Sequence, residues 1–137
     1  MNGYKLWFIS VGIIYVLLGI GFIPPINALR IPTMIPGFDA PINGTAYWGL
    51  LDFSFMFGLD LLVTGLFMLY ASREPMNNLS IIKLIIVLEI VRGICDDIYM
   101  ITKGNGIPFY IIFIILHLII IVSGISLIRK VKTADIR

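Results

Sequence analysis

The sequence is poor in cysteine, histidine and charge, and each shortage excludes a class of protein. Among 137 residues there is one cysteine, Cys95, and one histidine, His117. A lone cysteine excludes intrachain disulfides and dithiol redox chemistry, and a lone histidine excludes a bis-histidine haem. The sequence has no metal-ligand cluster of recognised spacing, no phosphate loop and no nucleophile–base pair. We therefore expect no metal and no cofactor. No basic tract interleaved with aromatics points to nucleic acid.

The sequence is instead rich in hydrophobic residues. They make up 59% of the sequence, against 13% charged residues, and the mean hydropathy is +1.02. This is the composition of an integral membrane protein. Four largely apolar stretches are long enough to cross a bilayer, namely 4–23, 47–70, 81–101 and 107–128. We predict an all-α integral membrane protein with a single domain over residues 1–137, folded as an antiparallel bundle of four transmembrane helices.

The third predicted span, 81–101, carries Glu89, Arg92, Asp96 and Asp97 among twelve Ile, Leu and Val residues. An Asp or Arg at a helix centre costs about 2.5–3.5 kcal/mol, and each apolar residue contributes roughly 0.3–0.6, so about two of the charges are offset. This helix should therefore lie inside the bundle. Spacing of i, i+3, i+7 puts Glu89, Arg92 and Asp96 on one stripe and allows two intrahelical ion pairs, with Asp97 about 100° away. The stripe is equally consistent with a packing device that fixes helix order.

Glycines and prolines indicate how the first two spans pack and connect. Gly12 and Gly19 in the first span, and Gly58 and Gly65 in the second, are each seven residues apart, which provides smooth faces for close helix approach. Residues 24–45 hold five of the seven prolines, which argues against a regular helix. The segment is too apolar for a free linker, and connections of this length are usually functional or disordered. We predict a folded flap on the membrane surface.

The distribution of Lys and Arg predicts the orientation, because cytoplasmic loops are enriched in these residues. Seven lie on one side of the predicted spans: Lys5, Arg73, Lys83, Arg129, Lys130, Lys132 and Arg137. The other side has Arg30 and Lys103. We therefore expect a multi-pass protein of the cell (inner) membrane with both termini in the cytoplasm and the proline-rich loop outside.

Five of the eight acidic residues fall inside predicted spans. The candidate ligand-binding residues are Asp52, Asp60, Glu89, Arg92, Asp96, Asp97 and His117. Asp52, Asp96 and Asp97 lie about 10 Å nearer the outer face than the others, at ~1.5 Å per residue. This pattern predicts an outward-facing acidic cleft under the flap. A mid-span Asp60 needs a partner, and Arg92 or His117 is the natural one. His117 itself is more typical of a hydrogen-bond partner for a buried carboxylate than of a metal ligand.

The polar residues also carry a resemblance. The run ASREP at 71–75, followed by LEIVRGI at 88–94 and DDIY at 96–99, is similar to the BphX-like family of small bacterial membrane proteins, and more distantly to DoxX-like four-helix proteins. The most specific part is the string E-x-x-R-G-x-x-D-D-x-Y. The similarity extends from the first span to His117. It implies a four-span fold and a bacterial or archaeal inner membrane, and it assigns no biochemical role.

Three functions are compatible with these observations. The first is a cleft that binds a proton, a cation or a small amphipathic ligand, since ionisable residues at mid-membrane serve such sites. The second is an accessory or structural subunit, as a homodimer or within a larger membrane complex. The third is an enzyme acting on a lipid or isoprenoid, with a carboxylate base and His117 as acid, and with no catalytic residue assigned. The first is favoured because five intramembrane acids exceed one Arg and one His. Membrane lipids are the expected surroundings in every case.

Overall fold

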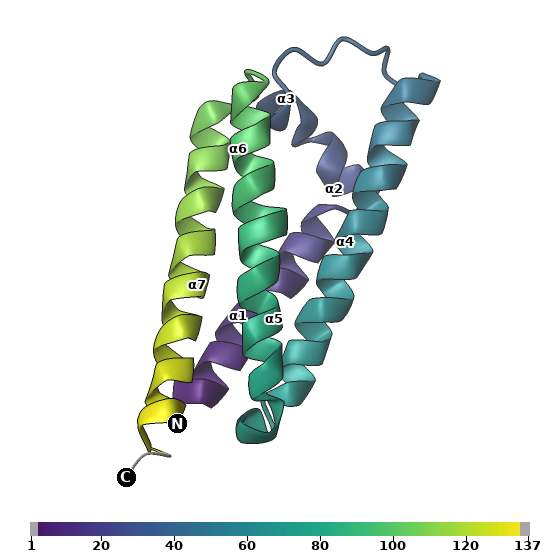
Figure 1. Ribbon diagram of the computed structural model, residues 1–137. Coiled ribbons are helices and arrows are strands. Elements are labelled where there is room, and N and C mark those ends of the chain that lie inside the picture. Colours follow the sequence, from purple (N-terminus) through teal and green to yellow (C-terminus); the bar gives the residue numbers. More distant parts are fainter. Residues whose placement is uncertain (1–2, 135–137) are drawn as a thin grey trace.

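The computed structural model describes residues 3–134, with side chains to residue 130, and every regular element in that range is a helix. This confirms the all-α class. The long segments are α1 (Gly3–Gly21), α4 (Thr45–Ala71), α7 (Ile107–Ala134), and a continuous run of α5 (Leu79–Leu88), η2 (Glu89–Ile94) and α6 (Cys95–Thr102) (Figure 1). A short 3-10 turn, η1 (Pro75–Asn78), precedes α5. Three helices, α1, α4 and α7, are long and apolar enough to cross a membrane. The third predicted span, 81–101, is divided by the π-helical turn η2 at its charged residues.

Helices α1 and α4 pack closely through the two predicted pairs of glycines. A Cβ atom added to Gly65 would lie 2.7 Å from the carbonyl oxygen of Gly12. One added to Gly19 would lie 2.7 Å from the carbonyl oxygen of Gly58. Only glycine lets the two backbones approach this closely, because any side chain would overlap the facing main chain. The predicted smooth faces are thus confirmed, and each is the partner of the other.

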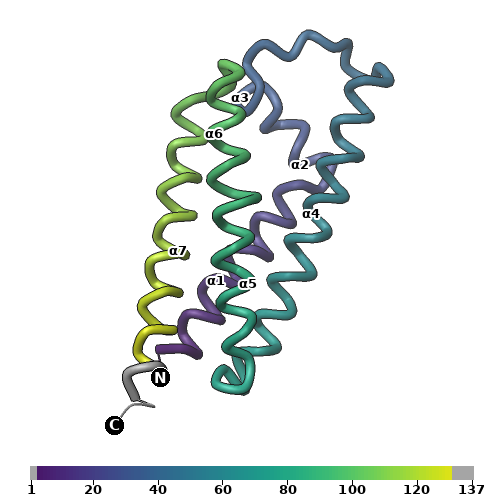
Figure 2. Tube along the Cα trace, viewed as in Figure 1, coloured from purple at the N-terminus to yellow at the C-terminus, as the bar shows by residue number. Residues whose placement is uncertain are grey.

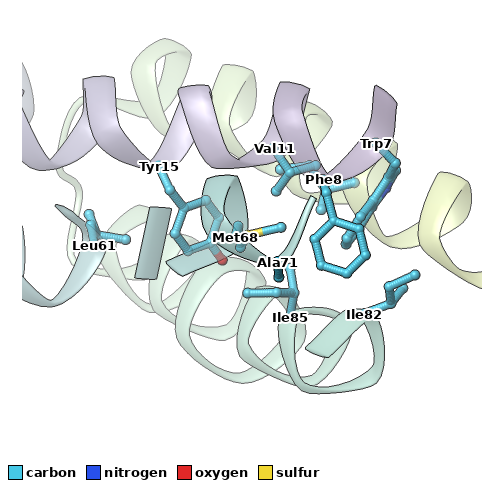
Figure 3. Close-up of a cluster of buried hydrophobic side chains, with 10 residues drawn as sticks. Trp7, Phe8, Val11, Tyr15, Leu61, Met68, Ala71, Ile82 and Ile85 are labelled. Carbon is cyan, nitrogen blue, oxygen red and sulfur yellow. The ribbon is translucent and has the colours of Figure 1, made fainter. Parts of the chain in front are cut away.

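The apolar core occupies one half of the molecule. Trp7, Phe8 and Val11 of α1 pack against Met68 and Ala71 of α4 and against Ile82 and Ile85 of α5 (Figure 3). The indole of Trp7 donates to the hydroxyl oxygen of Ser123 on α7 at 2.9 Å. Tyr15 lies at the edge of this core, and its hydroxyl group points towards the polar half. The buried polar residues therefore begin where the apolar core ends.

The flap contains two short helices, α2 (Pro24–Ala28) and α3 (Ile31–Met34), so the expectation that its prolines exclude helix is wrong. Prolines stand in the first turn of both helices, where a backbone N–H has no intrahelical partner to lose. Helix α2 packs on α4, and α3 packs on α7. Figure 2 shows the trace of α2 and α3 between α6 and α4. The flap is therefore folded against the helices rather than free.

Arg30 fixes the flap at its middle. Its guanidinium donates to the carbonyl oxygen of Gly21 at 2.9 Å and lies over the rings of Phe22, at 4.8 Å, and Phe109, at 5.9 Å. Burial lowers the pKa of the Arg30 guanidinium. At the end of α3, the amide of Gly106 donates to the carbonyl of Met34 at 3.3 Å. These contacts hold the flap to α1 and to the start of α7.

Candidate functional site

The π-helical turn η2 places the acidic residues of the third segment. On an α-helix, Glu89 and Asp97 would be separated by about 80°, since eight residues make about 2.2 turns. A π turn bonds i to i+5 and holds more residues in each turn, which reduces this rotation. Both carboxylates therefore reach His117 on α7. The predicted arrangement, with Asp97 turned away from the Glu89 stripe, is wrong for this reason.

His117 is the centre of the site. Its Nδ1 lies 2.5 Å from Oε2 of Glu89, and its Nε2 lies 3.4 Å from Oδ2 of Asp97. The other oxygen of Glu89 accepts a hydrogen bond from the hydroxyl of Tyr15 on α1. Glu89 is 3% exposed, so both its oxygens are occupied inside the protein. The prediction that His117 partners a buried carboxylate is confirmed.

Gly93 makes room for the imidazole. A Cβ atom at this position would lie 2.7 Å from both Cε1 and Nδ1 of His117. The ring therefore lies directly against the backbone of η2. The glycine and the π turn act together, because one removes a side chain and the other rotates Asp97 towards the ring. π turns occur frequently at functional sites.

Arg92 connects η2 to α4. Its Nη1 lies 3.2 Å from Oδ2 of Asp60, and its guanidinium lies 5.1 Å from the ring centre of Phe57. The side chain of Asp60 is 74% exposed, against 24% for Arg92. Arg92 is therefore the partner of Asp60, as the mid-span position of Asp60 predicted. Its carboxylate partner lies on another helix, in place of the intrahelical pairs with Glu89 and Asp96 that the spacing allowed.

A cavity of about 100 Å³ lies between these groups. The aromatic side chains of Phe22, Phe57, Phe109 and Phe113 contribute to its lining, and so do the carboxylates of Glu89, Asp96 and Asp97. Two buried polar groups of the lining lack a hydrogen-bond partner within the described side chains: Oδ2 of Asp97 and the hydroxyl of Tyr110. Asp97 is 6% exposed and Tyr110 is 4% exposed. Since buried polar groups are nearly always hydrogen-bonded, these two atoms are unusual in having no such partner among the described residues.

The structure brings together five of the seven candidate residues. Those that line the cavity are Glu89, Arg92, Asp96, Asp97 and His117. Asp52 and Asp60 are exposed on α4, and Asp60 reaches the site only through Arg92.

Three polar or charged residues of the lining were not among the candidates: Tyr15, Arg30 and Tyr110. A tyrosine near the middle of an apolar span was a usable signal for Tyr15, because its hydroxyl needs a partner there. Arg30 had no such signal, since its place in the cavity depends on the fold of the flap.

Comparison with known proteins agrees with the resemblance seen in the polar residues. The BphX-like family model matches residues 1–133. An uncharacterized BphX-like protein of Burkholderia cepacia is 23% identical over 137 residues, covering 100% of this chain and 99% of the relative. An uncharacterized BphX-like protein of Paraburkholderia xenovorans (strain LB400) has the same identity and coverage. No solved structure matches the chain significantly. The more distant similarity to DoxX-like proteins stays a prediction.

Proposed function

The chain belongs to the BphX-like family, and from its site we propose that it is a membrane protein that binds a small amphipathic cation in the cavity around Asp97. The proposed fold is one domain over residues 1–137, with four spans in a bacterial inner membrane and both termini in the cytoplasm. The three apolar helices and the count of Lys and Arg support this placement.

The α5–η2–α6 segment would be the remaining span. At ~1.5 Å per residue its 79–102 run measures about 36 Å, which is enough for a hydrocarbon core of about 30 Å. Glu89 and Asp97 are buried against His117, so hydrocarbon need not accept them. The outward faces of α4 and α7 expose large apolar side chains such as Phe53, Val63 and Ile112. Membrane lipids would cover these faces.

The buried carboxylate oxygen Oδ2 of Asp97, which accepts no hydrogen bond from the described residues, is the observation that carries the proposal. A buried acceptor without a partner costs about 1–3 kcal/mol, and a ligand that donates a hydrogen bond there would remove this cost. The hydroxyl of Tyr110 offers a second polar contact in the same cavity. A ligand with a positively charged donor therefore fits the site better than a neutral or anionic one.

The charges and rings of the lining favour a cation as well. Three carboxylates line the cavity, namely Glu89, Asp96 and Asp97, against the guanidinium groups of Arg30 and Arg92 and the imidazole of His117. Arg92 is further neutralised by Asp60, and Arg30 lies on the faces of two phenylalanine rings. The aromatic faces of the lining also attract cations, by about 0.5–2 kcal/mol each.

The volume limits the ligand to a compact head group. A cavity of ~150 Å³ holds benzene, and this one measures about 100 Å³. A primary ammonium group with a short alkyl chain matches both the volume and the apolar lining. For five non-hydrogen atoms, the ceiling of about 1.5 kcal/mol per atom predicts a Kd no tighter than roughly a few micromolar.

Three probes with an unbranched four-carbon chain and different polar groups test this proposal: n-butylammonium, n-butanol and n-butyrate. Calorimetric titration of the purified full-length protein in detergent should give binding for n-butylammonium and at least tenfold weaker binding for the other two. Asp97→Asn should weaken n-butylammonium binding by at least tenfold. Asp52→Asn removes an equal charge outside the cavity and should leave it unchanged. If n-butanol binds as tightly as n-butylammonium, the site does not select a cation and the proposal is wrong.

A further inference from the structure

The tautomer of His117 is fixed by Glu89. Oε1 of Glu89 accepts from the hydroxyl of Tyr15, and Oε2 lies 2.5 Å from Nδ1 of the imidazole. A carboxylate in this position accepts the Nδ1–H, which orients the ring and keeps a hydrogen on that nitrogen. The other nitrogen, Nε2, is therefore the one that gains or loses the second proton of His117.

Nε2 faces the same oxygen that the proposed ligand would use. It lies 3.4 Å from Oδ2 of Asp97, close enough for an ion pair, yet the described side chains provide Oδ2 with no hydrogen bond. Oδ2 thus faces Nε2 of His117 and still has a hydrogen-bond position for a ligand. The titratable or charged groups that share the cavity with His117 are Tyr15 of α1, Arg30 of the flap, Glu89 and Arg92 of η2, Asp96 and Asp97 of α6, and Tyr110 of α7. From α4, Asp60 acts only through its pair with Arg92.

The imidazolium of His117 and a ligand ammonium group thus both need the carboxylate of Asp97 as their counter-ion. With His117 doubly protonated, the imidazolium is neutralised by Asp97 on one side and by Glu89 on the other. An ammonium group that binds Asp97 takes away the counter-charge of Nε2 and stands beside it as a like charge, which favours loss of the Nε2 proton. Glu89 stays the counter-charge at Nδ1 and does not take the place of Asp97 at Nε2, the other nitrogen of the ring.

We propose that a ligand ammonium group and the Nε2 proton of His117 compete for Asp97, so that each cation bound releases one proton. In this step the N–H bond at Nε2 breaks, its electron pair stays on the ring, and the proton leaves to water. The ammonium then pairs with Asp97, and the net charge of the site is unchanged. This inference rests on the proposed function and adds to it the coupling of binding to protonation. Competition of this kind is what a cation–proton exchange across a membrane requires.

Proton release gives the direct test. The purified full-length protein is mixed with n-butylammonium in weakly buffered solution containing a pH indicator. A primary amine stays protonated near neutral pH, as lysine does, so released protons come from the protein. We expect about one proton released per cation bound. Calorimetry between about pH 5 and 8 should show an affinity that rises with pH, by up to tenfold per pH unit when one proton is released per cation bound.

Two variants test whether His117 releases the proton and whether Asp97 binds the cation. His117→Gln removes the imidazole, so n-butylammonium should still bind through Asp97, with an affinity that depends less on pH. Asp97→Asn should abolish both binding and proton release. Asp52→Asn, the matched control, should keep both. Because the chain has one histidine, ¹⁵N-histidine labelling provides one imidazole whose resonances report its charge. At fixed pH, n-butylammonium should convert them to the neutral pattern, and n-butanol should not.

The outcomes separate the two proposals. Binding of n-butylammonium with a pH-independent affinity and no proton release would overturn the competition and leave the cation site standing. Binding that keeps its full pH dependence in His117→Gln would show that another group supplies the proton, and would overturn it too. If n-butylammonium does not bind at any pH, the cation site itself is wrong and the competition fails with it.

Discussion

At the scale of single residues, the properties of His117 come from groups on other elements. Its own helix, α7, offers aliphatic and aromatic neighbours, while its polar contacts come from Glu89 of η2 and Asp97 of α6. Tyr15 of α1 completes the chain by donating to Glu89. Gly93 decides whether the ring can take this position at all, because it is the residue on which the ring lies.

Replacing Gly93 with alanine should destabilise the protein by about 1–3 kcal/mol, the usual cost of overpacking. The new Cβ would meet Cε1 and Nδ1 of His117 at 2.7 Å, so the ring must leave Glu89 or the π turn must reorganise. Thermal unfolding in detergent measures the loss. Gly49→Ala is the control, since its Cβ would meet nothing within 4 Å, and it should be neutral or stabilising by up to about 1 kcal/mol. Equal stabilities for the two variants would show that the ring does not lie against Gly93.

At the scale of elements, the sequence predicted the regular helices and their contacts better than the irregular ones. The glycine pairs predicted a face for close helix approach on each helix, and the structure shows that these two faces pack on each other. The partners of Asp60 and His117 followed from the need of a mid-span polar group for a counterpart. The π turn η2 was not predicted, since periodicity is read on the assumption of 3.6 residues per turn. The flap helices were also missed, because proline was treated as a helix breaker rather than as a first-turn residue.

A Cβ atom would have less space at Gly19 than at Gly12, which predicts that the two alanine variants differ in stability. Gly19→Ala should cost about 1–3 kcal/mol because its Cβ would lie 2.7 Å from two backbone atoms, Gly58 O and Leu62 N, that cannot rotate away. Gly12→Ala should cost less, since its nearest contacts are at 3.1 Å and include the flexible side chain of Leu69. Chemical unfolding of both variants beside the protein without substitution gives the order. A larger loss for Gly12→Ala would contradict this packing of α1 on α4.

The ion pair between Arg92 of η2 and Asp60 of α4 predicts that a second substitution can restore the folded yield lost by the first. Arg92→Ala should lower folded yield, because it leaves Asp60 unpaired near mid-span, where an Asp costs about 2.5–3.5 kcal/mol. Combining it with Asp60→Asn should restore much of the yield, since the stranded charge is then gone. Asp52→Asn in the same background should restore none. Folded yield is measured as the monodisperse fraction after detergent extraction. Equal rescue by Asp52→Asn would mean that the pair of Arg92 and Asp60 does not form.

At the scale of the whole molecule, the described chain has two distinct ends. Figure 1 places both ends of the described chain and the α4–α5 connection at one end, and the flap and the α6–α7 turn at the other. Five of the seven Lys and Arg residues assigned to the cytoplasm have described side chains at the first end, while the side chains of Lys132 and Arg137 lie outside the described part. The sequence predicted this division because loop charge is a local property. It also predicted an acidic cleft under the flap, but it could not predict the full lining, which needs the flap, η2 and α7 to meet.

The orientation of these ends is open to direct measurement. On a Cys95→Ala background, Pro36→Cys places a thiol in the flap and Met76→Cys places one in η1, between α4 and α5. A membrane-impermeant maleimide applied to spheroplasts should label residue 36, because the excess of Lys and Arg keeps the other end in the cytoplasm. Residue 76 should react only after the membrane is permeabilised. Labelling of residue 76 alone in intact spheroplasts would reverse the orientation. Labelling of both would place the two ends of α4 on one side of the membrane, so that α4 would not be a span and the four-span arrangement would be wrong.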